Sequence, residues 1–313
     1  MLELKDYIKG IEKGDISILA RAITLCESQK KEHQELAIKL LSKLKTKNHA
    51  LVLGISGTPG VGKSTFIEAF GLELIGLNKK VAVLAVDPTS EVTGGSILGD
   101  KTRMNELSTK AFIRPSPSGK TLGGVANKTR EAIQLCEAFG FDIILVETVG
   151  VGQSEAQVSK LVDIFMLLMQ PGAGDDLQAI KRGILELADY LIVNKADGEL
   201  LSKAKLTKTQ LEGSLEILRH KKMPIQLVSA LKKEGIKELA NNILGMKNDF
   251  ATKRAEQRAA WLSEVIDELM IRELIGNENY LLRKEKLMQE LINNKKSLED
   301  IGNEMKKGLS YGS

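Results

Sequence analysis

Residues 51–65 read LVLGISGTPGVGKST, an apolar run followed by a glycine-rich loop. The loop itself, GTPGVGKS at residues 57–64, has the spacing G-x-x-x-x-G-K-[ST] that is typical of phosphate-binding loops. Its glycines let the backbone curl so that successive N–H groups point at one phosphate, and the helix that follows adds the positive end of its dipole. This stretch therefore predicts a strand, a phosphate loop and a helix in that order.

The roles of the individual loop residues follow from this motif. Lys63 is expected to reach the β- and γ-phosphates of a nucleoside triphosphate, and Ser64 is expected to bind Mg²⁺. The residues predicted to bind the nucleotide here are Gly57, Thr58, Pro59, Gly60, Val61, Gly62, Lys63, Ser64 and Thr65.

Seven apolar runs between residues 47 and 245 alternate with segments of helical spacing, and the runs are rich in Val, Ile and Leu. Strands that are buried on both faces have this composition. Their alternation with helices predicts an α/β fold with a doubly wound, mostly parallel sheet, whose functional loops lie at the carboxyl ends of the strands. The predicted strands are residues 51–56, 81–86, 111–114, 141–147, 162–169, 190–194 and 225–229.

Three regions are predicted along the chain. Residues 1–46 form an N-terminal helical region, residues 47–245 form the nucleotide-binding domain, and residues 246–313 form a C-terminal helical arm. The arm carries an apolar stripe that includes Leu262, Val265 and Ile266 at helical spacing. Such a stripe must pack on something, which is either the parent domain or a second copy of the chain.

Carboxylates are expected to complete the metal site. Residues 141–146 form a buried run that ends in Glu147, and ETVG at 147–150 resembles the D-x-x-G switch motif, in which the N–H of Gly150 would sense the γ-phosphate. Asp87 and Asp100 follow the second predicted strand, and each is a metal ligand, a residue that positions water, or an ordinary turn aspartate. The predicted metal ligands are Ser64, Asp87, Asp100 and Glu147.

A second motif predicts which base the site accepts. Residues 194–197 read NKAD after a buried run, the N-K-x-D pattern of guanine-specific proteins. Asp197 would accept hydrogen bonds from guanine N1–H and the 2-amino group, which adenine cannot supply. Asn194 would hold the loop and Lys195 would lie over the purine. The segment Ser229, Ala230 and Leu231 is similar to the S-A-x loop that contacts guanine O6, so GTP is predicted rather than ATP.

Hydrolysis by the free chain is predicted to be slow. Ras-like proteins carry a catalytic glutamine directly after the switch glycine, whereas here Val151 holds that position and Gln153 lies two residues further on. Another element or a partner would then complete catalysis. One candidate is QPGAGDDLQAIKRG at 170–183, whose glycines beside charges indicate either a mobile segment or an ordinary connection.

Composition excludes several classes of function. The 45 basic and 41 acidic residues give a net charge of +4, too weak a bias to predict a nucleic-acid partner. The apolar runs are too short for a membrane span, and the acidic N-terminus is unlike a transit peptide. Cys26 and Cys136 form no C-x-x-C pair and are expected to be buried thiols, so we predict a cytoplasmic protein.

Six segments together resemble one family over about residues 15–275. They are GTPGVGKST, VDPTS with GGSILGDKTRM, IRPSPSGKTLGGVANKTREA, VETVGVGQSE, QPGAGDDLQAIKRG and NKAD. In them the chain is similar to the methylmalonyl-CoA mutase-associated GTPase chaperones, the G proteins that assist adenosylcobalamin-dependent acyl-CoA mutases.

This resemblance implies a homodimer that pairs through a C-terminal arm, and a chaperone that couples GTP hydrolysis to cofactor loading and protection of the mutase. It implies no cobalamin site on this chain. It places Asp87, Asp100 and Glu147 around the metal, Gln153 and Ser154 in the second switch, and residues 172–181 in a third switch that responds to the mutase. The resulting catalytic candidates are Lys63, Asp87, Asp100, Gln153 and Lys181.

Two other functions are alternatives for a chain with these motifs. A metal-insertion GTPase would need Cys or His ligands at metal spacing, but the three His are scattered and the two Cys are unpaired. Family members once carried the label of arginine/lysine transport kinases, yet the guanine-specific motif and the missing acceptor site argue against a kinase. The identity of the client mutase is open.

Overall fold

A seven-stranded parallel sheet forms the centre of the chain, with the strand order β3-β2-β4-β1-β5-β6-β7. Each of the seven predicted runs overlaps one strand, and the doubly wound α/β class is confirmed. The strands are β1 (Leu51–Gly57), β2 (Val81–Asp87), β3 (Phe112–Pro117), β4 (Ile143–Thr148), β5 (Ile164–Met169), β6 (Tyr190–Val193) and β7 (Ile225–Leu227).

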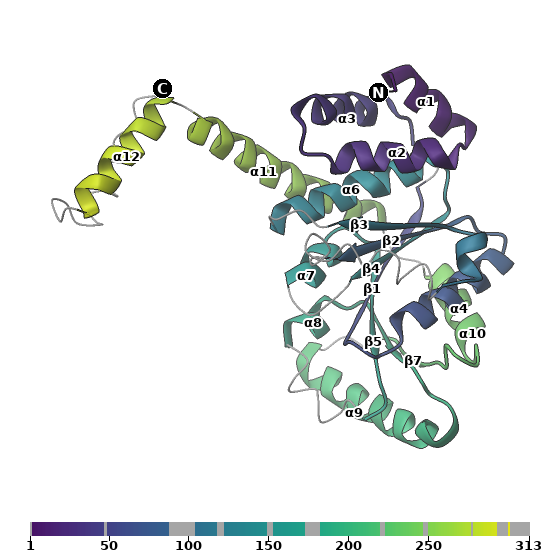
Figure 1. Cartoon of the computed structure of the whole chain (residues 1–313). Helices are drawn as coiled ribbons and strands as arrows, with labels where there is room; N and C mark the ends of the chain where they lie inside the picture. The colour runs from purple at the N-terminus through teal and green to yellow at the C-terminus, as the bar shows by residue number, and fades with distance from the viewer. Residues whose placement is uncertain are drawn as a thin grey trace. The chain divides into compact units, whose positions relative to one another are not determined.

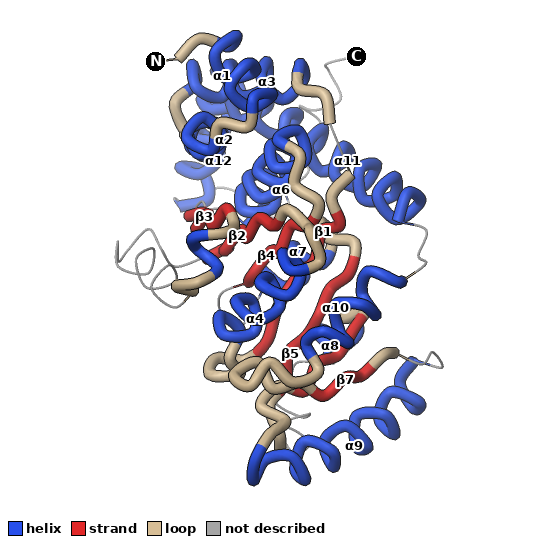
Figure 2. The backbone as a smooth tube through the Cα atoms, turned by 90° about the vertical axis from the view of Figure 1, so that its right-hand side faces the viewer, coloured by secondary structure: helices blue, strands red, loops and turns tan. Residues whose placement is uncertain are grey.

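The computed structural model describes residues 2–46, 49–87, 104–117, 122–148, 153–172, 182–219, 223–246, 250–276, 278–292 and 300. The chain divides into two units, Met1–Phe250 and Ala251–Ser313. The sheet belongs to the first unit, and its strands run beside one another through the middle of that unit (Figures 1 and 2). The three-part division made from the sequence stays a prediction.

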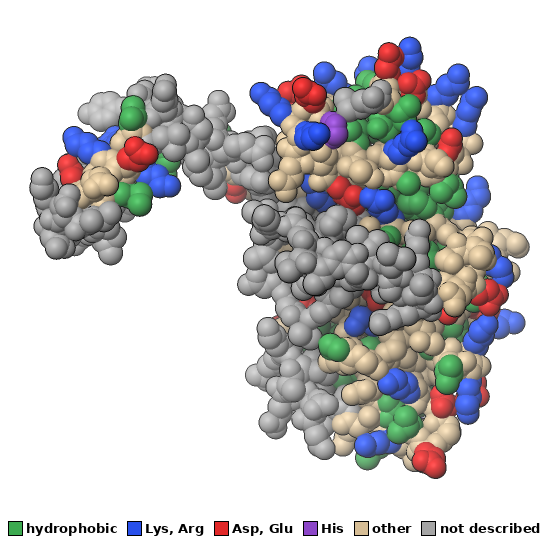
Figure 3. Space-filling view, viewed as in Figure 1, with side chains coloured by type: hydrophobic (Ala, Val, Ile, Leu, Met, Phe, Trp, Pro, Cys, Tyr) green, Lys and Arg blue, Asp and Glu red, His purple; other side chains and the backbone are tan. Residues whose placement is uncertain are grey.

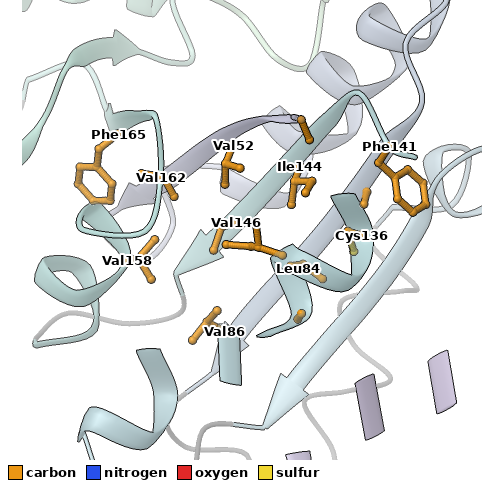
Figure 4. Packing of buried hydrophobic residues seen from close by; sticks show 14 of the residues in the cluster. Val52, Leu84, Val86, Cys136, Phe141, Ile144, Val146, Val158, Val162 and Phe165 are labelled. Carbon is orange, nitrogen blue, oxygen red and sulfur yellow. The ribbon is translucent and has the colours of Figure 1, made fainter. Parts of the chain in front are cut away.

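Helices cover both faces of the sheet because alternate residues of each strand point to opposite faces. One face packs against α4 (Lys63–Gly76) and α10 (Ile236–Gly245). The other packs against α6 (Leu122–Phe139), α7 (Gln153–Ser159), α8 (Arg182–Leu187) and α9 (Leu201–Arg219). Figure 4 shows this second cluster, in which Val52, Leu84, Ile144 and Val146 of the sheet meet Cys136 and Val158 of the helices.

The N-terminal region is helical, as the sequence predicts, and its three helices extend that second cluster. They are α1 (Leu4–Lys13), α2 (Ile16–Glu27) and α3 (Lys31–Lys43), and α2 lies alongside α6 in Figures 1 and 2. Asp15 starts α2 by accepting hydrogen bonds from the N–H groups of Ser17 and Ile18. The apolar side chains of α1, α2 and α3 share one core with the sheet, so these three helices are part of the first unit.

Aspartates directly before three strands tie each strand to its neighbour. The Asp163 carboxylate accepts the N–H of Val52 at 2.8 Å, and the Asp163 N–H donates to the Val52 carbonyl at the same distance. Asp142 pairs with Lys80 and Asp189 pairs with Phe165 in the same two-way manner. These pairs hold the register of the strands at their amino ends, and the phosphate loop lies at the carboxyl ends.

Both cysteines are free and buried, as predicted. Burial raises the pKa of the Cys26 thiol to about 12 and raises the pKa of Cys136 further. On the surface, basic and acidic side chains are interspersed over the coloured part of the face drawn in Figure 3, in keeping with the small net charge. No helix within the described ranges combines the length and apolar character needed to span a membrane.

The second unit consists of helices where the structure describes it. They are α11 (Phe250–Gly276) and α12 (Glu278–Ile292). On α11, Leu262, Ile266 and Met270 recur at a spacing of four residues, and each side chain is at least half exposed. This unit therefore presents an exposed apolar stripe along one helix.

Candidate nucleotide-binding site

The glycine-rich loop joins the carboxyl end of β1 to the first turn of α4. Strand β1 lies between β4 and β5, so the loop emerges near the middle of the sheet, where open α/β sheets bind ligands. Gly60 and Gly62 have φ angles of 79° and 93°, and Gly62 is the N-terminal cap of α4. These left-handed residues turn the backbone so that the helix starts with its free N–H groups at the loop.

Lys63 lies across this loop rather than out in solvent. Its Nζ donates to the carbonyl of Gly57 at 2.7 Å and makes a longer contact of 3.5 Å with the carbonyl of Thr58. Burial lowers the pKa of Lys63, and the nearby carboxylates of Glu147 and Glu155 act in the opposite direction. The ammonium group is thus held where the loop would surround a phosphate.

Asn194 joins the phosphate loop to the base-recognition loops. Its Nδ2 donates to the Val61 carbonyl at 2.9 Å, and its Oδ1 accepts the N–H of Ala230 at 3.1 Å. Lys195, whose φ angle is 58°, donates from Nζ to the carbonyl of Gly60 at 2.7 Å. Three motifs that the sequence analysis singled out separately therefore form one connected site.

Asp197 is held by the second base-recognition segment. The hydroxyl of Ser229 donates to the carboxylate of Asp197, and the Ser229 oxygen accepts the N–H of Lys232 at 3.1 Å. The backbone of Ala196 adds a 2.9 Å hydrogen bond to the Val228 carbonyl. Asp197 is half-buried, so a purine edge that reaches it would meet an oriented carboxylate. The side chain of Leu231 is 80% exposed, so only its backbone fits the predicted base contact.

The predicted metal ligands are described in part. Ser64 is half-buried in the first turn of α4, and Glu147 is buried on β4 opposite Ile55 of β1. Both therefore lie at the carboxyl edge of the sheet, beside the loop. Mg²⁺ in nucleotide sites takes one or two protein oxygens together with phosphates and water, so a hydroxyl and a carboxylate suit it. Within the described residues there is no group of three or more His, Cys, Asp or Glu that could hold a metal ion.

Several predicted residues fall outside what the structure describes. Asp100, Gly150 and Lys181 are among them, whereas Asp87 ends β2 and Gln153 begins α7 as backbone positions only. Their roles therefore stay predictions.

The sequence analysis missed Glu155. It is 1% exposed in the first turn of α7 and acts on Lys63 electrostatically. From sequence, a glutamate at this place is an ordinary partner of the helix dipole. Only the packing of α7 shows that it is buried near the phosphate loop.

With this geometry established, comparison with known proteins assigns the family. The family model described as methylmalonyl Co-A mutase-associated GTPase MeaB matches residues 19–279. The chain belongs to the MeaB family. The resemblance inferred from the motifs is thereby confirmed.

Relatives support the MeaB assignment over most of the chain. GTPase ArgK of Escherichia coli (strain K12) is 44% identical over 290 residues, which cover 88% of each protein. A putative GTPase of Caulobacter vibrioides is 51% identical over 274 residues, covering 83% of this chain and 84% of that protein. The mitochondrial methylmalonic aciduria type A homolog of Mus musculus is 44% identical over 282 residues, covering 83% of this chain and 68% of that protein.

A solved structure shows the same fold. The crystal structure described as LAO/AO transport system kinase aligns with a TM-score of 0.72 and 34% identity, covering 98% of this MeaB-family chain and 97% of that one. The fold of this MeaB-family chain is therefore shared with a solved structure.

Proposed function

We propose that this MeaB-family protein binds and hydrolyses GTP and uses that cycle as a chaperone of an adenosylcobalamin-dependent acyl-CoA mutase. The observation that carries the proposal is the bridge made by Asn194 between Val61 of the phosphate loop and Ala230 of the base loop. One side chain thus joins the loop that would bind the phosphates to the loop that would recognise the base. Methylmalonyl-CoA mutase is the first candidate client, because the family description names it.

Different residues of the site would bind the phosphates, the metal ion and the base. The loop amides and Lys63 would stabilise negative charge on the transferring phosphoryl group. Ser64 and Glu147 would hold Mg²⁺, which supplies further neutralisation of phosphate charge when it is bound. Asp197 would select guanine, because its half-buried carboxylate needs two N–H donors from the base. Asp87, Asp100, Gln153 and Lys181 stay candidates for completing hydrolysis.

The chaperone role and the homodimer are parts of the same proposal. The absence of glutamine at position 151 supports slow hydrolysis by the free protein and stimulation by the client mutase. The exposed stripe of Leu262, Ile266 and Met270 on α11 supports pairing of two copies through the arm.

The test of nucleotide choice uses calorimetry with GTP, GDP, ATP and xanthosine triphosphate in the presence of Mg²⁺, on wild type and on Asp197→Asn. The wild type should prefer GTP, and Asp197→Asn should lose about 100-fold in GTP affinity and gain affinity for xanthosine triphosphate. Glu199→Gln makes the same change at an exposed carboxylate two residues away and should change neither affinity. Unchanged GTP affinity in Asp197→Asn would refute the assignment of the base site.

The test of the partner measures GTP hydrolysis with and without a purified adenosylcobalamin-dependent mutase. We expect the mutase to raise the rate, and to raise it less in Lys181→Ala. If no such mutase from the source cell changed the rate, the chaperone part of the proposal would fail while the GTPase part stood.

A further inference from the structure

A partly buried polar network joins β6, β7 and α10 next to the loop of residues 229–235. The hydroxyl of Tyr190 donates to Oε1 of Gln226 at 2.8 Å, and Nδ2 of Asn242 donates to the same oxygen at 3.1 Å. Nε2 of Gln226 donates to the carbonyl of Gly235 at 3.1 Å. Tyr190 is 4% exposed and Gln226 is 8% exposed, so these two side chains lie in the core, whereas Asn242 is exposed on α10.

The orientation of the Gln226 amide follows from its partners. The Gly235 carbonyl can only accept, so the Gln226 nitrogen must face it, and the Gln226 oxygen is then left to accept from Tyr190 and Asn242. An amide in the middle strand position of β7 is also costly without such partners, because an apolar side chain would fill that place at no polar penalty. The arrangement therefore needs a reason beyond filling the core.

Gly235 connects the network to the loop of the nucleotide site that contains Ser229. It has a φ angle of 74°, and a Cβ at this position would lie 2.7 Å from the carbonyl oxygen of Leu227. The residue before it, Glu234, exchanges two backbone hydrogen bonds with Ser229, at 3.0 and 3.1 Å. Gln226 thus holds the far end of the loop whose first residue orients Asp197.

We propose that Gln226 is a positioning residue for guanine specificity, acting through Gly235 on the loop of residues 229–235. The inference rests on the proposed function, since it concerns how the same base site is kept in shape. Without the Gln226 amide the Gly235 end of the loop loses its side-chain tie to β7, although the backbone bonds between Ser229 and Glu234 remain. The buried Tyr190 hydroxyl loses its acceptor in the core. Ser229 and Ala230 then hold Asp197 and the base less firmly, while the contacts of Lys63 with its own loop are untouched.

The experiment compares three ligands in the presence of Mg²⁺: GTP, inosine triphosphate and inorganic tripolyphosphate. Inosine lacks the 2-amino group that Asp197 would bind. The Kd for inosine triphosphate divided by the Kd for GTP therefore measures how strongly the protein recognises that group. In Gln226→Met, which keeps the length but not the hydrogen bonds, we expect GTP affinity to fall about 10-fold and the ratio to fall about 5-fold. Affinity for tripolyphosphate should stay within about 2-fold of wild type, because the phosphate loop is unchanged.

Two further variants keep the test decisive. Tyr190→Phe removes one oxygen atom from the network and should lower the ratio about 2-fold, even if Gln226→Met does not fold. Gln210→Met makes the same exchange at an exposed position on α9 and should leave all three affinities as in wild type.

A ratio that stays at the wild-type value in Gln226→Met and Tyr190→Phe would overturn this proposal, as would a parallel loss of tripolyphosphate affinity. Failure of the wild-type protein to bind GTP would instead refute the proposed function itself.

Discussion

Asn194 uses both ends of its side-chain amide to join loops that are far apart in the sequence. Its partner carbonyl lies 133 residues earlier, and its partner N–H lies 36 residues later. The fit is close, because a Cβ on Gly62 would lie 2.8 Å from the Asn194 Nδ2. The N-K-x-D asparagine is therefore as much a part of the phosphate loop as of the base loop.

The first prediction concerns this residue. Asn194→Ala should lower the affinity for GTP and GDP by about 30-fold or more, because it leaves the Val61 carbonyl and the Ala230 N–H unpaired in a buried site. Calorimetry with both nucleotides measures the change. Asn105→Ala, at an exposed position, serves as the matched control and should bind as wild type does. Equal affinities in Asn194→Ala and wild type would show that the two loops hold their places without the bridge.

At the scale of secondary-structure elements, the aspartates before the strands decide how neighbouring strands are aligned. The bond from Val52 to Asp163 is buried, whereas the bond from Lys80 to Asp142 is exposed. A buried N–H that loses its charged acceptor stays desolvated without a hydrogen bond, which is costly, whereas an exposed N–H can bond to water instead. The same side chain in the same role should thus contribute differently to stability at the two sites.

The second prediction compares these two aspartates. Asp163→Ala should lower the free energy of unfolding by about 2–4 kcal/mol, and Asp142→Ala should lower it by about 1 kcal/mol or less. Urea unfolding followed by circular dichroism provides the measurement, and each variant is the control for the other. Equal losses would contradict the argument from burial.

The seven strands were predictable at this scale because strands buried on both faces carry unbroken apolar runs. Their boundaries differ from the predicted ones by a few residues. The fifth run began at Val162 in the prediction, yet β5 starts at Ile164. Asp163 forms its two-way pair with Val52 at that point, which the apolar pattern of the run does not reveal.

At the scale of the whole molecule, the second unit carries a row of exposed apolar side chains along one helix. The first unit buries most of its apolar side chains in two clusters, one on each face of the sheet, and exposes others, such as Ile38 and Leu206. The second unit leaves Leu262, Ile266 and Met270 exposed along α11. Exposed apolar stripes of this kind mark contacts with a partner. In the proposed homodimer, that partner is a second copy of this chain.

The third prediction tests that pairing. The wild-type protein should have twice the 34.3 kDa mass of one chain in size-exclusion chromatography with light scattering. Ile266→Glu should shift it to the mass of one chain, because a charge would then face the apolar partner surface. Ser263→Glu places the same charge on an exposed neighbour of the stripe and should leave the dimer intact. A single-chain mass for the wild type would contradict the pairing.

Local patterns in the chain were enough to predict the fold class and the seven strands, and they indicated the phosphate and base loops, whose binding of nucleotide stays a prediction. They succeed because each depends on neighbours in the chain: apolar runs form buried strands, and glycine and lysine at set spacings form a loop that accepts phosphate. The family resemblance drew on the same short segments.

Folding alone determined which of these segments meet. The bridge by Asn194, the burial of Glu155 near Lys63 and the Tyr190–Gln226–Asn242 network all join residues from different elements. A strand sequence specifies that a side chain is buried, but not which neighbour it meets, because that depends on the order of the strands and on the helices packed over them. Side-chain partners across the sheet therefore became visible only in the three-dimensional structure.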